Sequence, residues 1–198
     1  AIWPRVAEMA QAVLRIAAPP AKPLQVAPGK MPALSGVFAM SDSTGIYQHS
    51  LGIVPDRRHG YCGDDNARAL MLMNVARDLP AGERLRWSMT YASFIANAWS
   101  EEERCFRNFM GFDRRWLEER GSADSNGRTL WALGHTAECA PDADIREWAV
   151  EMFLRSRRCV SSESPLRTLC FAMLGEAALL RAGVPRQQAG DLLDQGGP

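Results

Sequence analysis

Apolar residues recur at the three- and four-residue spacing of an amphipathic helix in several stretches of the chain, and proline or glycine residues separate these stretches. The first stretch runs from Ile2 to Ala17 and ends before the pair Pro19 and Pro20. Residues 18–36 are rich in Pro, Ala and Gly, which is typical of a linker. The pattern therefore predicts an N-terminal helix and linker over residues 1–36, followed by one domain over residues 37–198.

Six further helices are predicted after Gly63, and short Pro-containing turns pair them into three helical hairpins. Asp64 or Asp65 suits the N-cap of the first helix, and Pro165 suits the first position of the fifth. Residues 37–61 and 101–122 are predicted to be irregular, with one short strand or hairpin in the earlier segment. The six helices are predicted to begin near residues 64, 83, 125, 141, 165 and 185. The fold class is therefore all-α.

Three of these helix starts share one pattern, in which an acid is followed four residues later by an arginine and six residues later by a leucine. The acid and the arginine lie one turn apart and can pair within the helix. Intervals of 60 and 39 residues between the copies favour an α-repeat or an α/α toroid, although acid caps and helical arginines are common in unrelated helices. In a toroid these helix ends line one mouth, where the arginines form either structural ion pairs or a ring that binds an anion or a polyol. The copies are Asp64, Arg68 and Leu70; Asp124, Arg128 and Leu130; and Glu163, Arg167 and Leu169.

The composition limits which classes of binding partner and which cellular compartment are expected. The 23 basic residues balance the 23 acidic ones, which removes the electrostatic case for nucleic acid or an anionic membrane. No apolar run approaches the roughly 18 residues that span a bilayer. The five cysteines form no CxxC pair, which argues against a zinc site and favours free thiols in a reducing cytoplasm. No cofactor or metal is expected, and the lack of a Gly-rich phosphate loop argues against a nucleotide-sugar site.

Polar and aromatic side chains gather between residues 45 and 68, around a predicted helix start. The free N–H groups of a helix start favour acids and hydrogen-bond acceptors there. Asp, Asn, Arg and Gln are bidentate partners for the vicinal hydroxyls of a sugar, and a tyrosine can stack on a sugar face. The segment therefore predicts a carbohydrate-binding site. Its candidate substrate-binding residues are Gln48, His49, Arg57, His59, Tyr61, Asn66 and Arg68.

A second polar segment spans residues 107–131 and joins the first predicted hairpin to the second. Together with residues 45–68 it is expected to line the mouth. It combines arginines, acids and aromatic residues with glycines that suit hinges. Arg128 and Trp131 are its candidate sugar-binding residues, although an aromatic residue on a repeat helix is more often part of the core.

Paired carboxylates are the basis for a catalytic hypothesis, because glycoside hydrolysis uses two carboxyl groups about 5 to 10 Å apart. Asp64 and Asp65 point about 100° apart on a helix, so one is expected to cap the helix and the other to do chemistry. Cys62 is a further candidate as a nucleophile, because a nearby His59 and a helix start lower the pKa of a thiol. The candidate catalytic carboxylates are Asp64, Asp65, Asp113 and Asp124.

Four motifs together resemble one protein family. They are GIYQH at 45–49, GYCGDDNARAL at 60–70, NFM at 108–110 with FDRRW at 112–116, and GRTLWALG at 127–134. The chain is similar over residues 37–180 to bacterial α/α-toroid domains, which occur alone or fused behind glycosyltransferases and are often encoded beside mannoside phosphorylases. The resemblance implies a fold like that of the six-hairpin glycosidases and a carbohydrate ligand, but it implies no particular reaction.

The chain departs from this family in chemistry and in length. Where the family has Glu-Asp-Ser-His-Gly-Arg, this chain has Ala123 and Asn126 in place of the Glu and the His, and Gly63 replaces a Thr. The loss of two ionisable groups favours a non-catalytic module that binds a glycan or a glycosyltransferase over an enzyme. A six-hairpin toroid needs about twelve helices, whereas this chain supplies three hairpins. A half-toroid of this kind is expected to pair with a second copy or with a missing second half, or else to expose an apolar face.

Overall fold

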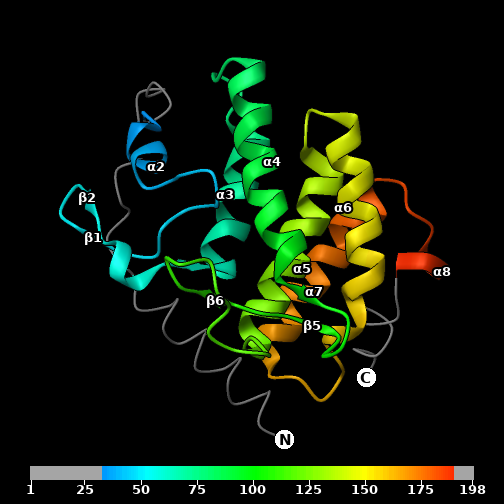
Figure 1. Ribbon diagram of the computed structural model, residues 1–198. Helices are drawn as coiled ribbons and strands as arrows, with labels where there is room; N and C mark the ends of the chain where they lie inside the picture. The colour runs from blue at the N-terminus through cyan, green and yellow to red at the C-terminus, as the bar shows by residue number, and fades with distance from the viewer. Residues whose placement is uncertain (1–32, 190–198) are drawn as a thin grey trace, which may run out of the picture. The chain divides into compact units, whose positions relative to one another are not determined.

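The computed structural model describes residues 33–189 of the chain (Figure 1). These residues belong to one compact unit that begins at Ala33. The helix predicted over residues 2–17 and most of the predicted linker lie outside the described residues. Helices account for most of the described chain and its strands are two residues long, which confirms the all-α fold class. None of the described helices is long and apolar enough to cross a membrane.

The first two predicted hairpins are present in the described part of the chain, and of the sixth predicted helix one turn is described. The side chain of Asp142 caps one of their helices by accepting the N–H groups of Asp144 and Ile145, both at 3.1 Å. Pro165 directly precedes a further helix, as its fixed φ favours. The hairpins are α3 (Gly63–Val75) with α4 (Ala81–Ala98) and α5 (Ala123–Cys139) with α6 (Ala143–Ser156). Helix α7 (Leu166–Arg181) is followed by the short helix α8 (Arg186–Ala189), so the third hairpin stays a prediction. A short helix that was not predicted, α2 (Ser35–Ala39), precedes all of these helices.

Helices α3, α5 and α7 form a row with α5 in the middle, while α4 packs on α3 and α6 packs on α5 (Figure 1). The row is parallel, because ion pairs join the helices at their N-terminal turns and Arg181 of α7 reaches Glu138 of α5 at the other end, 2.6 Å away. Helices α5 and α7 approach closely at two glycines. A side-chain carbon on Gly134 would collide with the carbonyl oxygen of Gly175. The arrangement brings three helix N-termini together on one end of the row.

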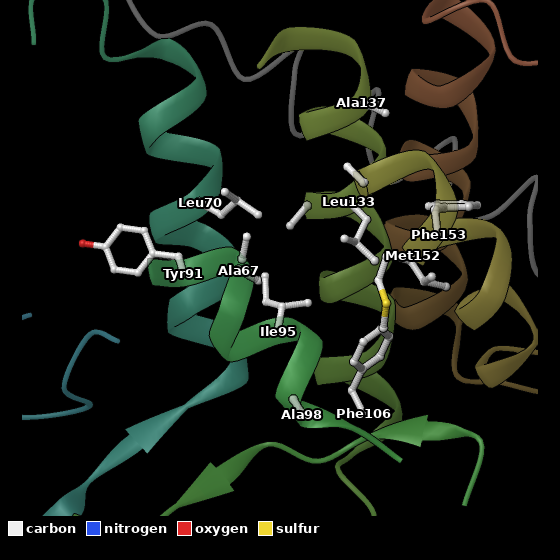
Figure 2. Close-up of a cluster of buried hydrophobic side chains, with 14 of the residues drawn as sticks. Ala67, Leu70, Tyr91, Ile95, Ala98, Phe106, Leu133, Ala137, Met152 and Phe153 are labelled. Atoms are coloured by element: carbon white, nitrogen blue, oxygen red, sulfur yellow. The ribbon is translucent and has the colours of Figure 1, made fainter. Parts of the chain in front are cut away.

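The hydrophobic core lies between these helices and holds them in place (Figure 2). Leu70, Ile95, Leu133 and Phe153 come from α3, α4, α5 and α6, and each is at most 1% exposed. Burial of one such side chain contributes roughly 1.5–3 kcal/mol. The helix ends that carry the polar residues are therefore positioned by a well-packed interior.

Short strands tie the loops to the N-terminal end of the row. Strand β3 (Tyr61–Cys62) pairs with β6 (Phe109–Met110), and the N–H of Gly63 donates to the carbonyl of Asn108 at 2.7 Å. This pairing brings the segments 45–68 and 107–131 side by side, as the predicted mouth requires. The predicted hairpin in the earlier segment is formed by β1 (Ser50–Leu51) and β2 (Val54–Pro55). A second hairpin, β4 (Trp99–Ser100) with β5 (Cys105–Phe106), was not predicted.

The prediction that an aspartate caps α3 is wrong. The N-cap is Cys62, whose Sγ accepts the N–H of Asp65 at 3.4 Å, and both Asp64 and Asp65 lie in the first turn. Pairing of β3 with β6 keeps residues 61 and 62 extended, so the helix begins directly after them at Gly63. Both aspartates are therefore available for contacts outside the cap.

Candidate functional site

The first turns of α3, α5 and α7 carry an alternating chain of acids and arginines, which we call the acid–arginine ladder. Asp64 lies 3.2 Å from Arg68 and 2.6 Å from Arg128. Asp124 lies 3.3 Å from the same Arg128 and 2.6 Å from Arg167. The ladder thus runs Arg68, Asp64, Arg128, Asp124, Arg167 across three helices, and it is built from the three copies of the sequence pattern.

The partner predicted for Arg167 is wrong. Glu163 was expected to pair with it inside one helix, but α7 begins only at Leu166 and Glu163 precedes it. Arg167 therefore has no acid one turn below it in its own helix, and its Nε donates to Asp124 of α5 at 2.6 Å. The repeat consequently links neighbouring helices as well as the turns within each helix.

The ladder is buried at its centre and open at its ends. The Arg128 side chain is 16% exposed, whereas those of Arg68 and Arg167 are 52% and 72% exposed. The guanidinium of Arg128 also lies 4.5 Å from the ring centre of Phe171. The side chain of Trp131 stacks on the same Phe171 ring at 5.5 Å, so it packs between α5 and α7 and presents at most one face to a ligand.

Asp64 has an unusual electrostatic environment. Burial raises the pKa of its carboxyl above the ordinary 3.8, the neighbouring carboxylates of Asp65 and Asp124 raise it further, and the charges of Arg128 and Arg68 oppose the rise. A carboxyl with a raised pKa beside a second acid is the arrangement that supports acid–base roles. Asp64 and Asp124 share one guanidinium, which keeps them closer than the roughly 9.5 Å upper separation of glycosidase carboxyl pairs.

Cys62 is not poised as a nucleophile. Burial raises the pKa of its thiol, and the carboxylate of Asp65 raises it further. The thiol donates to Oδ2 of Asp65 at 3.0 Å. The helix start that was expected to lower the pKa is outweighed by this buried, acidic surrounding. The nucleophile hypothesis for Cys62 is therefore wrong.

Two residues predicted to touch a ligand serve as internal supports. Tyr61 is 1% exposed, stacks on Tyr47 and donates to Asp42 at 2.7 Å. Asn66 is fully buried, where its Oδ1 accepts the N–H of Ile46 at 3.1 Å. Neither side chain reaches the surface, so both are corrected from candidate ligand contacts to positions that fix the loop before α3.

Asn66 has a counterpart in the second repeat that was not predicted. Its Nδ2 donates to Cys62 four residues earlier, at 2.8 Å. Asn126 does the same toward Ser122 at 2.9 Å, while its Oδ1 accepts the N–H of Phe106 at 2.8 Å. The signal was visible in the sequence as an Asn two residues after the acid in both copies, and the third copy has Pro165 there. Each asparagine fastens the preceding loop to the start of its helix.

Asp113 stands apart from the ladder. Its side chain is 62% exposed and contacts Arg115, two residues further along the same loop, at 3.6 Å. Asp65, by contrast, lies close to the ladder, because its Oδ1 accepts a hydrogen bond from Arg68 at 2.9 Å. The carboxylates that the fold gathers are therefore Asp64, Asp65 and Asp124.

The remaining candidates form a second polar cluster near the β1–β2 hairpin. The rings of His49 and His59 lie 4.3 Å apart, and Nε2 of His59 lies 3.7 Å from Asp56. Arg58, which was not predicted, donates to Asp56 at 2.7 Å and lowers the pKa of that carboxyl to about 2. The other two candidates line the same region: the guanidinium of Arg57 lies over Phe112, and the backbone N–H of Gln48 donates to Gly60.

Asp42 is a further half-buried polar residue that sequence reasoning missed. Its carboxylate accepts the hydroxyl groups of Tyr47 and Tyr61 at 2.9 and 2.7 Å and the N–H of Thr44 at 2.7 Å. Burial opposes ionisation of Asp42, but these hydrogen bonds outweigh it and leave its pKa below the ordinary value. The turn-forming run around residue 42 was the available signal.

In the described residues, no group of three or more His, Cys, Asp or Glu is placed to hold a metal ion.

Comparison with known proteins adds no family assignment. No protein-family model matches this chain, and no curated protein matches it. The likeness to α/α-toroid domains therefore rests on the motifs described above and stays a prediction.

Proposed function

We propose that this domain binds a carbohydrate across the acid–arginine ladder. The observation that supports this is the meeting of acids and arginines from three repeat units at one end of the helical row. Guanidinium and carboxylate groups are bidentate partners for vicinal hydroxyls. Three arginines stand against Asp64, Asp65 and Asp124, so the surface has no net charge and suits an uncharged polyol rather than a phosphate or a nucleic acid.

Binding without catalysis is the activity that the geometry favours. The side chain of Arg128 contacts both Asp64 and Asp124, and so occupies the space that a scissile bond between these carboxylates would need. The family's Glu and His are replaced by Ala123 and Asn126, and the amide of Asn126 is engaged with the backbone of Phe106. Without these two ionisable groups, the ladder retains hydrogen-bonding chemistry and loses an acid–base pair.

Glycoside cleavage is the second candidate, because the pKa of Asp64 is raised and Asp124 is its neighbour across Arg128. In this reading Asp64 donates the proton and Asp124 acts as base or nucleophile. Release of reducing ends from an oligosaccharide bound by the wild type, abolished by Asp64→Asn, would establish it. Binding without any release would leave the non-catalytic function.

A glycan array probed with the labelled protein tests the proposed function. The variant is Arg68→Gln with Arg167→Gln, because both side chains are exposed and their loss leaves the buried centre of the ladder in place. We expect at least a tenfold loss of affinity for the glycan bound by the wild type. The control is Arg181→Gln, since Arg181 also links α7 to α5 but at the opposite end of the row. A wild type that binds no glycan, or equal loss in the control, would contradict the proposal.

The proposal extends to the assembly and to the compartment. The parallel row α3, α5, α7 with α4 and α6 outside it supports three hairpins of a toroid, and two copies would supply six. Leu166 and Leu174 are 64% and 48% exposed on one face of α7, where a further hairpin would pack.

Cysteines that form no disulfide support a reducing cytoplasm.

Light scattering on the full chain tests this assembly. We expect twice the 21.9 kDa mass of one chain, and the mass of one chain for Leu166→Glu with Leu174→Glu. A wild type with the mass of one chain contradicts the paired half-toroid and leaves a glycosyltransferase as the alternative occupant of that face.

A further inference from the structure

A polar pocket lies beside the ladder at the same end of the helical row. It has a volume of about 350 Å³ and opens between the β4–β5 hairpin and the loop at residues 116–119. We call it the Trp116 pocket. The lining residues that matter below are Ser100, Glu102, Arg107, Trp116, Glu118 and Glu119.

Asn108 connects the pocket to the first turn of α3, which carries part of the ladder. The side chain of Asn108 accepts the N–H of Asp64 at 3.1 Å, which places it against the ladder. The backbone N–H of the same Asn108 donates to Glu118 of the pocket at 2.8 Å, and its neighbour Arg107 lines the pocket. A ligand that extends beyond the ladder across residues 107–109 therefore reaches the Trp116 pocket next.

The pocket contains an aromatic ring and a guanidinium group that together suit a sugar ring. Trp116 is half-buried, with its edge against Phe94 and the guanidinium of Arg107 over it at 5.2 Å. Nε of Arg107 is buried and makes no hydrogen bond to any described residue. Arg107 also lines the pocket, so an accessible N–H group of its guanidinium can donate to a hydroxyl of a bound ligand. Ser100 supplies a further hydroxyl on the pocket wall.

The charge of the pocket determines which sugars it can accept. Four glutamates line it against the single arginine. Glu103 is paired with Arg120 at 2.5 Å, and Glu118 accepts the N–H of Asn108, whereas Glu102 and Glu119 are exposed at the rim. An excess of carboxylates repels a uronate or a sugar phosphate and attracts an ammonium group.

We infer that the Trp116 pocket is a second subsite of the glycan-binding surface, which takes a neutral or amine-bearing sugar ring and rejects an anionic one. The inference rests on the proposed function, since it extends the same ligand beyond the ladder. The pocket adds a selection against anionic sugars, which the uncharged ladder by itself does not provide.

Three β-1,4-linked hexasaccharides of matched length test the inference: mannohexaose, the glucosamine hexamer and the mannuronate hexamer. Isothermal titration with the full-length wild type should show binding of the first two and at least tenfold weaker binding of the third. Glu102→Gln with Glu119→Gln should weaken the glucosamine hexamer about two- to fivefold per carboxylate and leave mannohexaose unchanged. Glu147→Gln, an exposed change on α6, is the matched control and should change neither.

The contribution of the ring is tested by Trp116→Ala, for which we expect about tenfold weaker binding of mannohexaose. Trp116→Phe keeps the packing against Phe94 and should recover part of that affinity, which separates stacking from folding. Wild type that binds none of the three hexamers overturns this inference, and it overturns the proposed function as well if the glycan array also shows no binding. A different result overturns the subsite alone. In that result the Arg68 and Arg167 variant weakens binding, but neither the Trp116 variants nor the glutamate variant changes it.

Discussion

The Nε atom of Arg128 in α5 lies 2.6 Å from Oδ1 of Asp64 in α3. The two residues occupy different copies of the repeated pattern, so the pair fastens one helical hairpin to the next. Arg128 also reaches Asp124 in its own helix, and Asp124 continues the contact to α7 through Arg167. One pattern repeated along the sequence thus becomes one continuous polar surface in the folded chain.

Arg128→Leu is expected to destabilise the domain by about 1–3 kcal/mol. The substitution leaves Asp64 and Asp124 partly buried without their shared cation, which is costly in a region of reduced solvation. Chemical denaturation measures the change in the free energy of unfolding. Arg181→Leu is the control and should cost less than about 1 kcal/mol, because the Arg181 side chain is 61% exposed. Equal losses in both variants would show that the centre of the ladder has no special role.

The carboxyl of Asp64 should titrate above the ordinary value of 3.8 in the folded protein, as followed by the carboxyl carbon signal in an NMR pH series. Because the folded state binds this proton more tightly, the contribution of Asp64 to stability is fully present below 3.8 and is lost as the pH rises through the folded pKa. Arg128→Leu should move the midpoint higher still, since the guanidinium favours the carboxylate. A midpoint at or below 3.8 would contradict the burial that the structure shows.

Asn66→Ala and Asn126→Ala should each cost about 1–3 kcal/mol of stability. Each removes the acceptor of a loop N–H, from Ile46 in one case and from Phe106 in the other, and leaves that donor unsatisfied. Hydrogen exchange should accelerate at the N–H of Ile46 in the first variant and at that of Phe106 in the second. Gln187→Ala, at an exposed position of α8, is the control and should change neither measurement. Unaltered exchange at both amides would refute the anchoring role of these asparagines.

Gly134→Ala should destabilise the domain by about 1–3 kcal/mol or more, because the added methyl group meets the carbonyl of Gly175 on α7. Gly82→Ala provides the matched comparison within α4, where a side-chain carbon meets nothing within 4 Å. This second change should stabilise the domain by about 0.5–1 kcal/mol, since alanine is the better helix former. Thermal unfolding of the two variants compares them directly. Stabilisation by both substitutions would mean that α5 and α7 are further apart than the structure shows.

The helices of the first five predicted positions, the first two hairpins and the repeated acid–arginine pattern could be predicted from the order and spacing of residues alone. These features depend on contacts within one or two turns, such as the cap at Asp142 and the proline before α7, and residue types at fixed spacing report such contacts directly. The sequence also indicated that segments 45–68 and 107–131 belong together, which the pairing of β3 with β6 achieves.

Which candidate side chains are buried and which are exposed could not be predicted from residue spacing, because it depends on how the helices pack. Arg167 pairs with Asp124 instead of Glu163, Asn66 and Tyr61 turn inward, and burial raises the pKa of the Cys62 thiol. Each of these outcomes depends on atoms supplied by residues far away in the sequence, and desolvation depends on everything packed around a group. Residue type and spacing therefore predict local hydrogen bonds. The burial of a side chain and the charges around it depend on how the helices pack against one another.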